Sequence, residues 1–491
     1  MKLGSVLQFL DNKSILVTGA AGFLAKIFVE KVLRVQPNVK KLYLLLRADD
    51  AKSAAQRLQS DVLEKELFRV LREKCGEDFS SLISDKVITV AGDITFRDLG
   101  LKDSELRDQM LDQINVIINL AATTKFDERY DVALNVNTLG TQHVVEFARK
   151  CNKLTVLVHV STAYVSGERE GMIQETPYKM GETLNGAMGL DIDEELKIVG
   201  QRLEELKRDG VPEKETRIAM KELGIKRAKV YGWPNTYVFT KAIGEMVVGE
   251  LKGEVPVVIL RPTIVTSTYR EPFPGWAEGV RTVDSLAVGY GTGKLTCFLG
   301  DIDGIVDIIP ADMVVNSIMV AMTEQAGRPG QSIYQVGTST RNPIRYRRLQ
   351  EFALRYFTTN PYINKKGKPV KVGEVKVLKN MDSFHRFMTL RYLLWLKGLE
   401  LVNAALCKSF EGTCNDLNKK IKFIMRLVEL YRPYLFFKGL FDDANTENLR
   451  AALRESDAAE ADSFCFDPTC INWEDYAMNV HIPGIVKYVF K

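Results

Sequence analysis

The chain has 491 residues, of which 46% are hydrophobic and 26% are charged, with no excess of Pro or Gly, so the composition excludes an intrinsically disordered protein. The 67 Lys and Arg against 63 Asp and Glu leave a net charge of +4, which is too small to indicate nucleic-acid binding. The seven Cys have no paired short spacings and no accompanying His, which argues against a disulfide framework and against a metal site.

The first predicted elements are a strand at 14–17 and a helix that starts a few residues later. In TGAAGFLAKIFVEKVLR, glycines give way at once to apolar residues at helical spacing, which is typical of a strand, a tight turn and a helix. Further apolar strands are expected at 42–46, 87–90, 116–120, 156–160 and 257–260, with a charged helical insertion around 51–76 and a helix at 137–150. Apolar strands that alternate with helices indicate an α/β fold, a doubly wound parallel sheet of Rossmann type.

The pattern changes after about residue 345, and two domains are expected because single cores stop growing near roughly 250–300 residues. We predict that 1–360 form a nucleotide-binding reductase domain with substrate elements, and that 361–491 form a mostly helical C-terminal domain. The expected linker is 362–371, which contains Lys, Gly and Pro. No run of about eighteen apolar residues occurs, so no transmembrane helix is predicted.

The turn after the first strand is the candidate cofactor site. Gly19 permits the turn, Gly22 lets the backbone approach a pyrophosphate, and Ala25 allows close helix packing. The N–H groups at the helix start could then hold phosphates, although a glycine turn without a ligand is the alternative. The other expected cofactor contacts around the sheet are Thr18, Phe23, Leu24, Ile94, Ala121 and Pro262.

The residue that closes the second strand bears on which nicotinamide cofactor is used. An acid there would bond the ribose 2′-hydroxyl, but the residue is Arg47, whose guanidinium suits a 2′-phosphate, so NADPH is favoured. A solvated surface arginine is the rival interpretation. Asp93, just after the third strand, is placed to meet the adenine, and an aspartate that only stabilises its own turn is the alternative.

Tyr237 and Lys241 are the candidate catalytic pair. They stand four residues apart in a helical stretch, so their side chains share one face. A nearby ammonium lowers the cost of a phenolate, which lets Tyr237 give its proton to a carbonyl oxygen as hydride arrives. In VHVSTAY, Thr162 follows a strand and can hold the substrate oxygen, with Ser161 as the rival for that role.

These motifs carry a resemblance to a known family. TGAAGFLA, VHVSTAYVSG and YVFTK resemble the extended short-chain dehydrogenases/reductases. KLYLLLR, GDIT, NLAATTKFDERYDVALNVNTLGT, WPNTYVFTK, LRPTIV and FDPTCINWEDYAMNVHIPGIVKYV resemble more particularly the plant-type alcohol-forming fatty acyl-CoA reductases, over nearly the whole chain. The resemblance implies that Thr162, Tyr237 and Lys241 are catalytic and that Asn137 supports the lysine through a water.

The family also implies an activity and a place in the cell. It implies NADPH-dependent reduction of a long-chain fatty acyl-CoA to a primary fatty alcohol, through an aldehyde and with release of CoA, in lipid and wax metabolism. It suggests peripheral attachment to the cytosolic side of the endoplasmic reticulum membrane, with a cytoplasmic location as the alternative. The first strand starts so early that no room for a cleavable leader is expected. The sequence indicates no oligomeric state.

Two apolar, basic helices are expected in the C-terminal region. One carries 393–399 together with Arg386, Arg391 and Lys397, and the other covers 419–441. Such helices could lie on a membrane or wall an acyl tunnel, and ordinary packing between the domains is the alternative. We expect His159 and His481 to be packed or hydrogen-bonded rather than catalytic.

Two other functions and one other chemical route remain open. Another extended short-chain dehydrogenase could act on a sterol or sugar nucleotide, but the long 162–237 segment and the C-terminal region argue against it. A nucleotide-sensing scaffold without activity would be expected to have lost Tyr237 or Lys241. A covalent thioester route would need an activated cysteine, and none of the cysteines has a convincing base partner: Cys75, Cys151, Cys297, Cys407, Cys414, Cys465 and Cys470.

Overall fold

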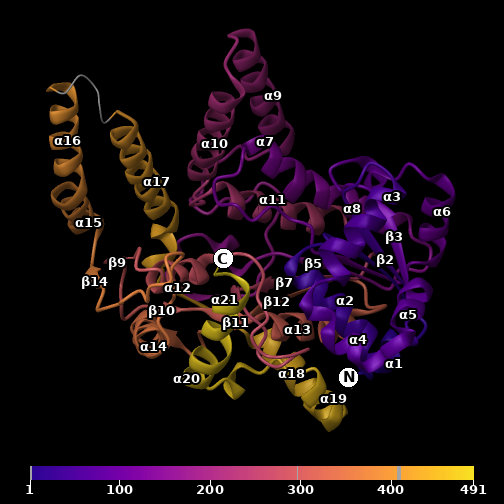
Figure 1. Cartoon of the computed structure of the whole chain (residues 1–491). Coiled ribbons are helices and arrows are strands. Elements are labelled where there is room, and N and C mark those ends of the chain that lie inside the picture. The colour runs from indigo at the N-terminus through magenta and orange to yellow at the C-terminus, as the bar shows by residue number, and fades with distance from the viewer. Residues whose placement is uncertain (1–2, 296, 406–410, 491) are drawn as a thin grey trace.

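The computed structural model describes residues 3–295, 297–405 and 411–490, and a seven-stranded sheet forms its centre (Figure 1). Its strands are β1 (Ser14–Thr18), β2 (Lys41–Leu46), β3 (Val87–Ala91), β4 (Val116–Asn119), β5 (Val156–Val160), β7 (Val257–Pro262) and β12 (Gln331–Val336). All neighbours run parallel, in the order β12-β7-β5-β4-β1-β2-β3. The order reverses between β1 and β4, and doubly wound sheets bind ligands beyond the strand ends at such a point. The predicted fold class is confirmed.

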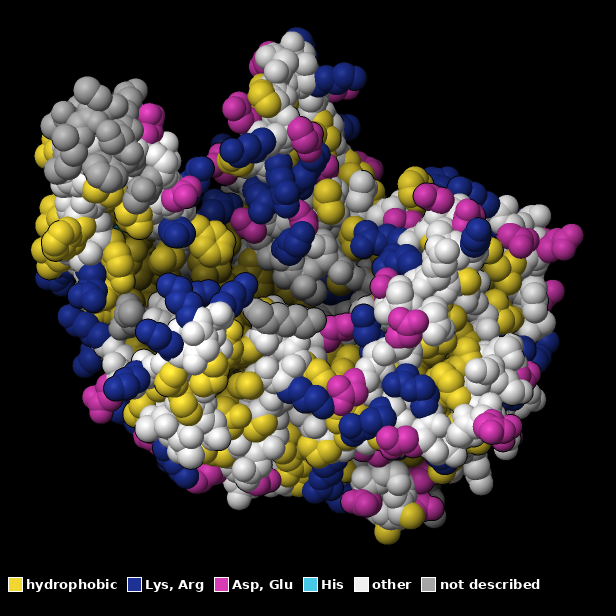
Figure 2. Space-filling view, in the orientation of Figure 1, with side chains coloured by type: hydrophobic (Ala, Val, Ile, Leu, Met, Phe, Trp, Pro, Cys, Tyr) yellow, Lys and Arg dark blue, Asp and Glu magenta, His cyan; other side chains and the backbone are white. Residues whose placement is uncertain are grey.

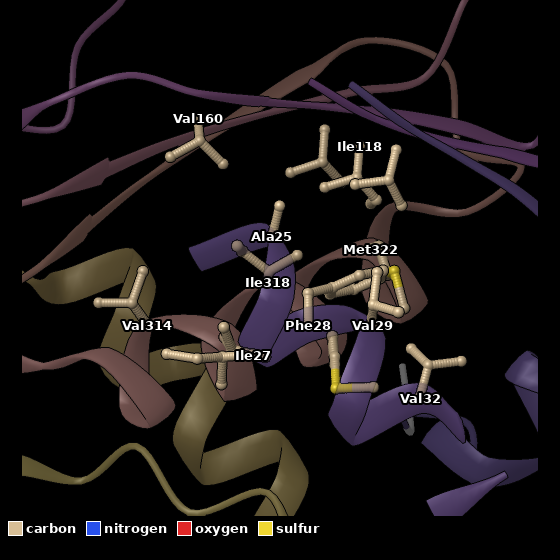
Figure 3. Close-up of a cluster of buried hydrophobic side chains, with 14 of the residues drawn as sticks. Ala25, Ile27, Phe28, Val29, Val32, Ile118, Val160, Val314, Ile318 and Met322 are labelled. Atoms are coloured by element: carbon tan, nitrogen blue, oxygen red, sulfur yellow. The ribbon is translucent and has the colours of Figure 1, made fainter. Parts of the chain in front are cut away.

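Successive residues of β1 point to opposite layers of the molecule. Ile15 and Val17 join the buried cluster of α2 (Phe23–Val35) and α13 (Ala311–Gln325), whereas Leu16 joins that of α8 (Gly140–Lys150). Both faces of the sheet are therefore covered, which explains why its strands are continuous apolar runs. Figure 3 shows the first cluster, where the side chains of α2, α13 and the sheet point toward one another: Ala25, Ile27, Phe28, Val29, Val32, Ile118, Val160, Val314, Ile318 and Met322.

The charged insertion between β2 and β3 is helical, as predicted. It contains α3 (Ala51–Arg57), η1 (Leu58–Leu63), η2 (Glu66–Phe68), α4 (Arg69–Cys75), η3 (Gly76–Asp78) and α5 (Phe79–Lys86). The helix predicted at 137–150 begins earlier, with α7 (Tyr130–Ala133) and η5 (Leu134–Leu139) before α8. The other helices before β5 are α1 (Val6–Leu10), η4 (Arg97–Gly100) and α6 (Ser104–Gln113).

A long helical pair fills the segment between β5 and β7. After η6 (Ala163–Ser166) and β6 (Gly171–Ile173), α9 (Ile192–Arg208) and α10 (Glu213–Val230) project from the body, and α11 (Thr236–Leu251) returns to the sheet (Figure 1). Met220 and Ala228 of α10 are buried in one cluster with Phe239 and Ile243 of α11. The projecting pair is thereby anchored on the helix that carries the candidate catalytic residues.

Apart from α13 and β12, short strands and two helices form the region between β7 and the C-terminal part. They are β8 (Ile264–Thr266), α12 (Thr282–Gly291), β9 (Cys297–Leu299), β10 (Ile305–Val306), β11 (Ile308–Pro310), β13 (Ile344–Arg345) and α14 (Tyr346–Thr359). β8 continues directly from β7 and pairs with β11 in parallel, so Ile264 lies opposite Ile308. This region therefore starts at the carboxyl end of the main sheet.

The C-terminal part opens with a projecting arm. After β14 (Lys376–Leu378), the arm is formed by α15 (Met381–Met388), η7 (Thr389–Leu393), α16 (Leu394–Ala405) and α17 (Glu411–Leu435) (Figure 1). The predicted helix at 419–441 is wrong at its end, because α17 stops at Leu435 and β15 (Gly439–Phe441) pairs with β6. Pro433 removes a helical N–H donor, and a Cβ on Gly439 would lie 2.5 Å from the side chain of Ile173.

The last segments return to the body. They are α18 (Ala444–Ser456), α19 (Ala458–Ser463), η8 (Pro468–Cys470), α20 (Trp473–Asp475), η9 (Tyr476–His481) and α21 (Ile482–Tyr488). Phe464, Phe466 and Tyr476 lie in the buried cluster that also contains β1 and α2. The carboxylate of Glu460 accepts hydrogen bonds from the N–H groups of Val6 (2.8 Å) and Leu7 (3.1 Å) at the start of α1. Two domains divided at residue 360 stay a prediction. None of the described helices is both long and apolar enough to cross a membrane.

Candidate active site

The glycine turn lies against the end of β4. Gly19 has a φ of +65°, and a Cβ on it would lie 2.8 Å from the backbone of Ala121. Thr18, the last residue of β1, donates a hydrogen bond from Oγ1 to Oδ1 of Asn119 (2.7 Å) and accepts one from the N–H of Ala121 (3.2 Å). The turn is thus fixed at the reversal of the strand order, where only glycine fits.

The start of α2 presents N–H groups at this turn. Gly22 occupies the N-cap position, and within the described part of the chain no side chain caps this end. The ring of Phe23, the first helical residue, stacks on Trp276 at 5.0 Å and lies 3.7 Å from the guanidinium of Arg281. Burial lowers the pKa of Arg281, which marks a desolvated cation beside the helix start. Arg281 was not predicted from the sequence, because it lies in a loop far along the chain and belongs to no motif.

The predicted adenosine contacts lie further along the same edge of the sheet. Arg47 is exposed directly after β2, and its carbonyl accepts a 2.7 Å hydrogen bond from Nη1 of Arg57. Asp93 accepts a 2.9 Å hydrogen bond from the N–H of Thr95, so it stabilises its own turn in this structure. Ile94 is buried. Its side chain packs closely on Gly140, where a Cβ would lie only 2.7 Å from it. Contacts of Arg47, Asp93 and Ile94 with a cofactor remain predictions.

Thr162 and Tyr237 come together beyond the end of β5. Asn235 caps α11 by accepting a hydrogen bond from the N–H of Val238 (3.1 Å), which places Tyr237 in the first turn of that helix. Burial raises the pKa of Tyr237 to about 12, and a side-chain hydrogen bond with Thr162 opposes the rise. Oγ1 of Thr162 also lies 3.5 Å from the carbonyl of Pro262. Two hydroxyl groups thus meet at one point, as a developing oxyanion would need.

Lys241 lies one turn further along α11 and is buried. Its ammonium donates a hydrogen bond to the carbonyl of Val160 (2.8 Å) and lies 3.3 Å from Nε2 of His159. Burial lowers the pKa of Lys241 to about 8, and the charge of Glu245 partly opposes this shift. The structure therefore brings Thr162, Tyr237 and Lys241 to the same strand end.

A chain of buried polar groups connects this lysine with the glycine turn. Nδ2 of Asn119 lies 3.0 Å from Nδ1 of His159, and Oδ1 of Asn119 accepts from Thr18. Burial and the charge of Lys241 hold the pKa of His159 well below its ordinary value, so the imidazole is neutral. His159 is hydrogen-bonded, in agreement with the expectation. The role of Asn119 in this chain was not predicted, because a single Asn at the end of a strand belongs to no sequence motif.

Asn137 supports the backbone rather than contacting the lysine directly. Its side-chain amide donates to the carbonyl of Thr123 (3.1 Å) and to Oγ1 of Thr240 (3.0 Å), and its Oδ1 accepts from the N–H of Thr123 (3.0 Å). These bonds tie η5 to the catalytic helix next to Lys241. The water-mediated support of Lys241 stays a prediction.

Ser161 has a hydroxyl that is free for a ligand. The residue is 5% exposed, and its Oγ finds no hydrogen-bond partner among the described residues. A buried hydroxyl without a partner is costly unless something else supplies one. Together with the glycine turn and the uncapped start of α2, this group fits a nicotinamide cofactor. Ser161 therefore remains the rival of Thr162 for the substrate oxygen.

Aromatic rings wall the other side of Tyr237. The ring of Phe126 stacks on Tyr237 at 6.2 Å and on Tyr434 of α17 at 4.9 Å. The amide of Asn235 donates a 2.7 Å hydrogen bond to the hydroxyl of Tyr434. Tyr164 meets Tyr434 edge-on at 5.1 Å. The projecting arm thus contributes directly to the apolar side of the site.

The cysteine pair Cys465 and Cys470 lies away from this centre. Cys465 hydrogen-bonds with Cys470, which lowers the pKa of Cys465 to about 6. The carbonyl of Cys465 accepts from Asn316 of α13 (2.8 Å), so the pair lies against that helix and not at the end of β5. Cys407 lies outside the described residues.

Comparisons with known proteins identify the family of the chain. Two family models, both described as male sterility protein, match the chain: an NAD-binding domain matches residues 17–318 and a second domain matches 391–491. The cofactor is therefore a nicotinamide. The terminal R domain from the myxalamid PKS-NRPS biosynthetic pathway has the same fold, with a TM-score of 0.56 at 18% identity over 98% of this chain and 92% of that one.

Two plant proteins match over almost the full length. Alcohol-forming fatty acyl-CoA reductase from Simmondsia chinensis is 55% identical over 490 residues, and fatty acyl-CoA reductase 1 from Arabidopsis thaliana is 52% identical over 486 residues. Each alignment covers 99% of both chains. The chain therefore belongs to the plant-type alcohol-forming fatty acyl-CoA reductases, which are oxidoreductases.

Proposed function

We propose that this protein uses NADPH to reduce a long-chain fatty acyl-CoA to a primary fatty alcohol, through an aldehyde and with release of CoA. The observation that carries the proposal is the meeting of the Thr162 and Tyr237 hydroxyls at the end of β5. In the sheet, β4 alone lies between β5 and the strand that precedes the glycine turn. The names of the two plant relatives give fatty acyl-CoA as the substrate of those proteins. The extension to this chain, and to wax and other lipid metabolism, is our proposal.

The cofactor would supply hydride, and residues around the turn would hold its phosphates. The N–H groups of Gly22, Phe23 and Leu24 would bind the pyrophosphate, because a helix start is an anion site. The guanidinium of Arg281, close to Phe23, adds a positive charge there. Arg47 would bind the 2′-phosphate, which is the reason for preferring NADPH over NADH.

Tyr237 acts as the general acid. Its pKa of about 12 keeps the phenol protonated in the resting enzyme, so a proton is ready for the carbonyl oxygen. Thr162 holds the same oxygen with its hydroxyl. The charge of Lys241, which the carbonyl of Val160 holds in place, lowers the cost of the phenolate that remains after the transfer.

The reaction proceeds in two reductions at one site. The first hydride and proton convert the thioester to a hemithioacetal. The hemithioacetal returns its hydroxyl proton to the phenolate of Tyr237 as it expels the thiolate of CoA and leaves an aldehyde. The second hydride and proton convert the aldehyde to the alcohol. Each acyl-CoA therefore consumes two molecules of NADPH.

Product analysis tests the proposal. We expect purified protein with NADPH and palmitoyl-CoA to yield hexadecanol, free CoA and two equivalents of NADP⁺, measured by mass spectrometry and absorbance. Turnover of a sterol or sugar nucleotide instead would indicate another extended short-chain dehydrogenase. Binding of NADPH without turnover of any thioester, aldehyde or alcohol would indicate a nucleotide-sensing scaffold.

The projecting arm supports a peripheral membrane contact, which we propose is with the cytosolic face of the endoplasmic reticulum. Large apolar side chains are exposed on it, among them Leu390 (67%), Trp395 (77%) and Phe423 (67%). Figure 2 shows hydrophobic side chains along the arm and Lys and Arg gathered around its base. Apolar groups next to cations suit the interface of an anionic membrane.

A further inference from the structure

An apolar cavity of about 100 Å³ lies between α12, α14 and the last helices of the chain. Ala287 and Tyr290 of α12, Phe352 and Ala353 of α14, and Ile482 of α21 are among its lining residues. The proposed reaction does not account for this cavity, because none of these residues belongs to the glycine turn or to the group around Thr162, Tyr237 and Lys241.

Of the four polar side chains in the wall, Tyr290, Tyr346 and His481 form hydrogen bonds with groups outside the cavity, and Gln350 is the fourth. The hydroxyl of Tyr290 donates to the carbonyl of Gly373 (2.9 Å), and the hydroxyl of Tyr346 donates to the carbonyl of Tyr434 (3.4 Å). His481 hydrogen-bonds with Ser267 (3.0 Å) and lies 3.3 Å from a carboxylate oxygen of Asp284. A wall of this kind offers water few partners, so the cavity suits a hydrocarbon.

The cavity lies close to the catalytic end of β5. Ile308 lines it and pairs with Ile264, which follows Pro262 by two residues, and the carbonyl of Pro262 lies 3.5 Å from Thr162 Oγ1. Ile264 packs against both the buried cluster that contacts Tyr237 and the cluster that lines the cavity. Ile264 therefore links the cluster around the catalytic tyrosine with the wall of the cavity.

A second path leads through the arm. Tyr346 lines the cavity and bonds the backbone of Tyr434, while the ring of Tyr434 packs on Phe126, which stacks on Tyr237. All of these side chains are wholly or partly buried. Apolar and aromatic contacts thus connect the two sites through Ile264 and through these rings.

We propose that this cavity receives the methyl end of the acyl chain and thereby sets the chain length of the substrate. This inference rests on the proposed function. An engineered apolar cavity of about 150 Å³ binds benzene, so a volume of about 100 Å³ holds only the last few carbons of a chain. Chains that end within the cavity gain apolar burial, and chains that are too long for it cannot place their thioester at Tyr237.

Two substitutions that fill the cavity from different helices test this assignment. Ala287→Leu on α12 and Ala353→Leu on α14 each add bulk inside, and Thr358→Leu adds the same kind of side chain at an exposed position of α14. Acyl-CoAs from decanoyl to docosanoyl serve as substrates, with kcat/KM measured for each. NADPH affinity and the thermal midpoint of unfolding are measured in parallel to identify variants that fail to fold.

We expect both cavity variants to lose about tenfold or more in kcat/KM on the wild-type optimum, since a methylene that does not fit costs at least this much. Their optimum should move to shorter chains, with NADPH affinity unchanged, whereas Thr358→Leu should keep the wild-type profile. Folded cavity variants with the wild-type profile would overturn the inference while leaving the proposed reaction intact. A wild-type enzyme that reduces no acyl-CoA would instead refute the reaction itself.

Discussion

The ammonium of Lys241 donates a 2.8 Å hydrogen bond to the carbonyl of Val160, two residues before Thr162 in the chain. The bond fixes the end of β5 to the catalytic helix, so the substrate oxygen, the acid and the cation keep a constant geometry. Because burial lowers the pKa of this lysine to about 8, its charge changes close to that pH.

We predict that kcat/KM falls as the pH rises through about 8, where Lys241 loses its proton. Lys241→Arg keeps a positive charge, so the residual activity of that variant should not fall in this range. The pKa lies below the ordinary value of 10.5, so between about pH 8 and 10.5 the unfolded chain binds more protons than the folded chain. The contribution of Lys241 to the free energy of unfolding therefore rises with pH in this range. The same decline in Lys241→Arg would assign the titration to another group.

Tyr237→Phe should reduce kcat roughly 100- to 10,000-fold, because the variant lacks the proton donor. NADPH affinity should stay nearly unchanged, since the ring remains in place. Tyr356→Phe, which removes a hydroxyl from α14, is the matched control and should keep full activity. Single-turnover kinetics with palmitoyl-CoA measures the effect, and a fully active Tyr237→Phe would refute the assignment of the acid.

Arg47→Asp should shift cofactor preference from NADPH toward NADH. Loss of a charge-assisted bond to the 2′-phosphate weakens the binding of NADPH roughly ten- to 100-fold. The new carboxylate accepts a hydrogen bond from a ribose hydroxyl of NADH instead. Fluorescence titration with both cofactors gives the ratio. Arg208→Asp, the same charge change at an exposed site on α9, is the control. An unaltered ratio in Arg47→Asp would mean that this side chain does not touch the phosphate.

Arg281→Gln should weaken the binding of NADPH and NADH equally, by roughly tenfold. Both cofactors carry the pyrophosphate that we propose binds at the start of α2, where this guanidinium lies over Phe23. This pattern differs from the selective effect of Arg47→Asp, so the two arginines can be told apart by one set of titrations. Arg281→Lys should recover part of the affinity. A loss confined to NADPH would place Arg281 at the 2′-phosphate instead.

Trp395→Asp combined with Leu401→Asp should lower the fraction of protein that floats with phosphatidylserine-containing liposomes, because both side chains are more than 70% exposed on the arm, at 77% and 75%. Ile218→Asp, on the other projecting helical pair, should float like the wild type. Equal flotation of all three proteins would remove the arm from membrane contact.

The sheet and the catalytic pair were accessible from the sequence because their signals are local. Apolar runs bounded by turns indicated β1 to β5, and Tyr237 and Lys241 share a helical face because they stand four residues apart. Arg281 and the Asn119–His159 contact were not predictable, since each depends on a neighbour that is distant in the chain. The end of α17 was misjudged for the same reason: the partner of β15 is β6, far upstream.

The bonds from Glu460 to the start of α1 have a consequence for biosynthesis. Together with Phe464, Phe466 and Tyr476, which pack in one cluster with α2, they place segments made early and late during translation in one hydrophobic core. The emerging chain can form its nucleotide-binding sheet on the ribosome, but it cannot close this core until these late residues have left the exit tunnel. Truncations before residue 460 should therefore yield a protein that binds chaperones and aggregates rather than a smaller reductase.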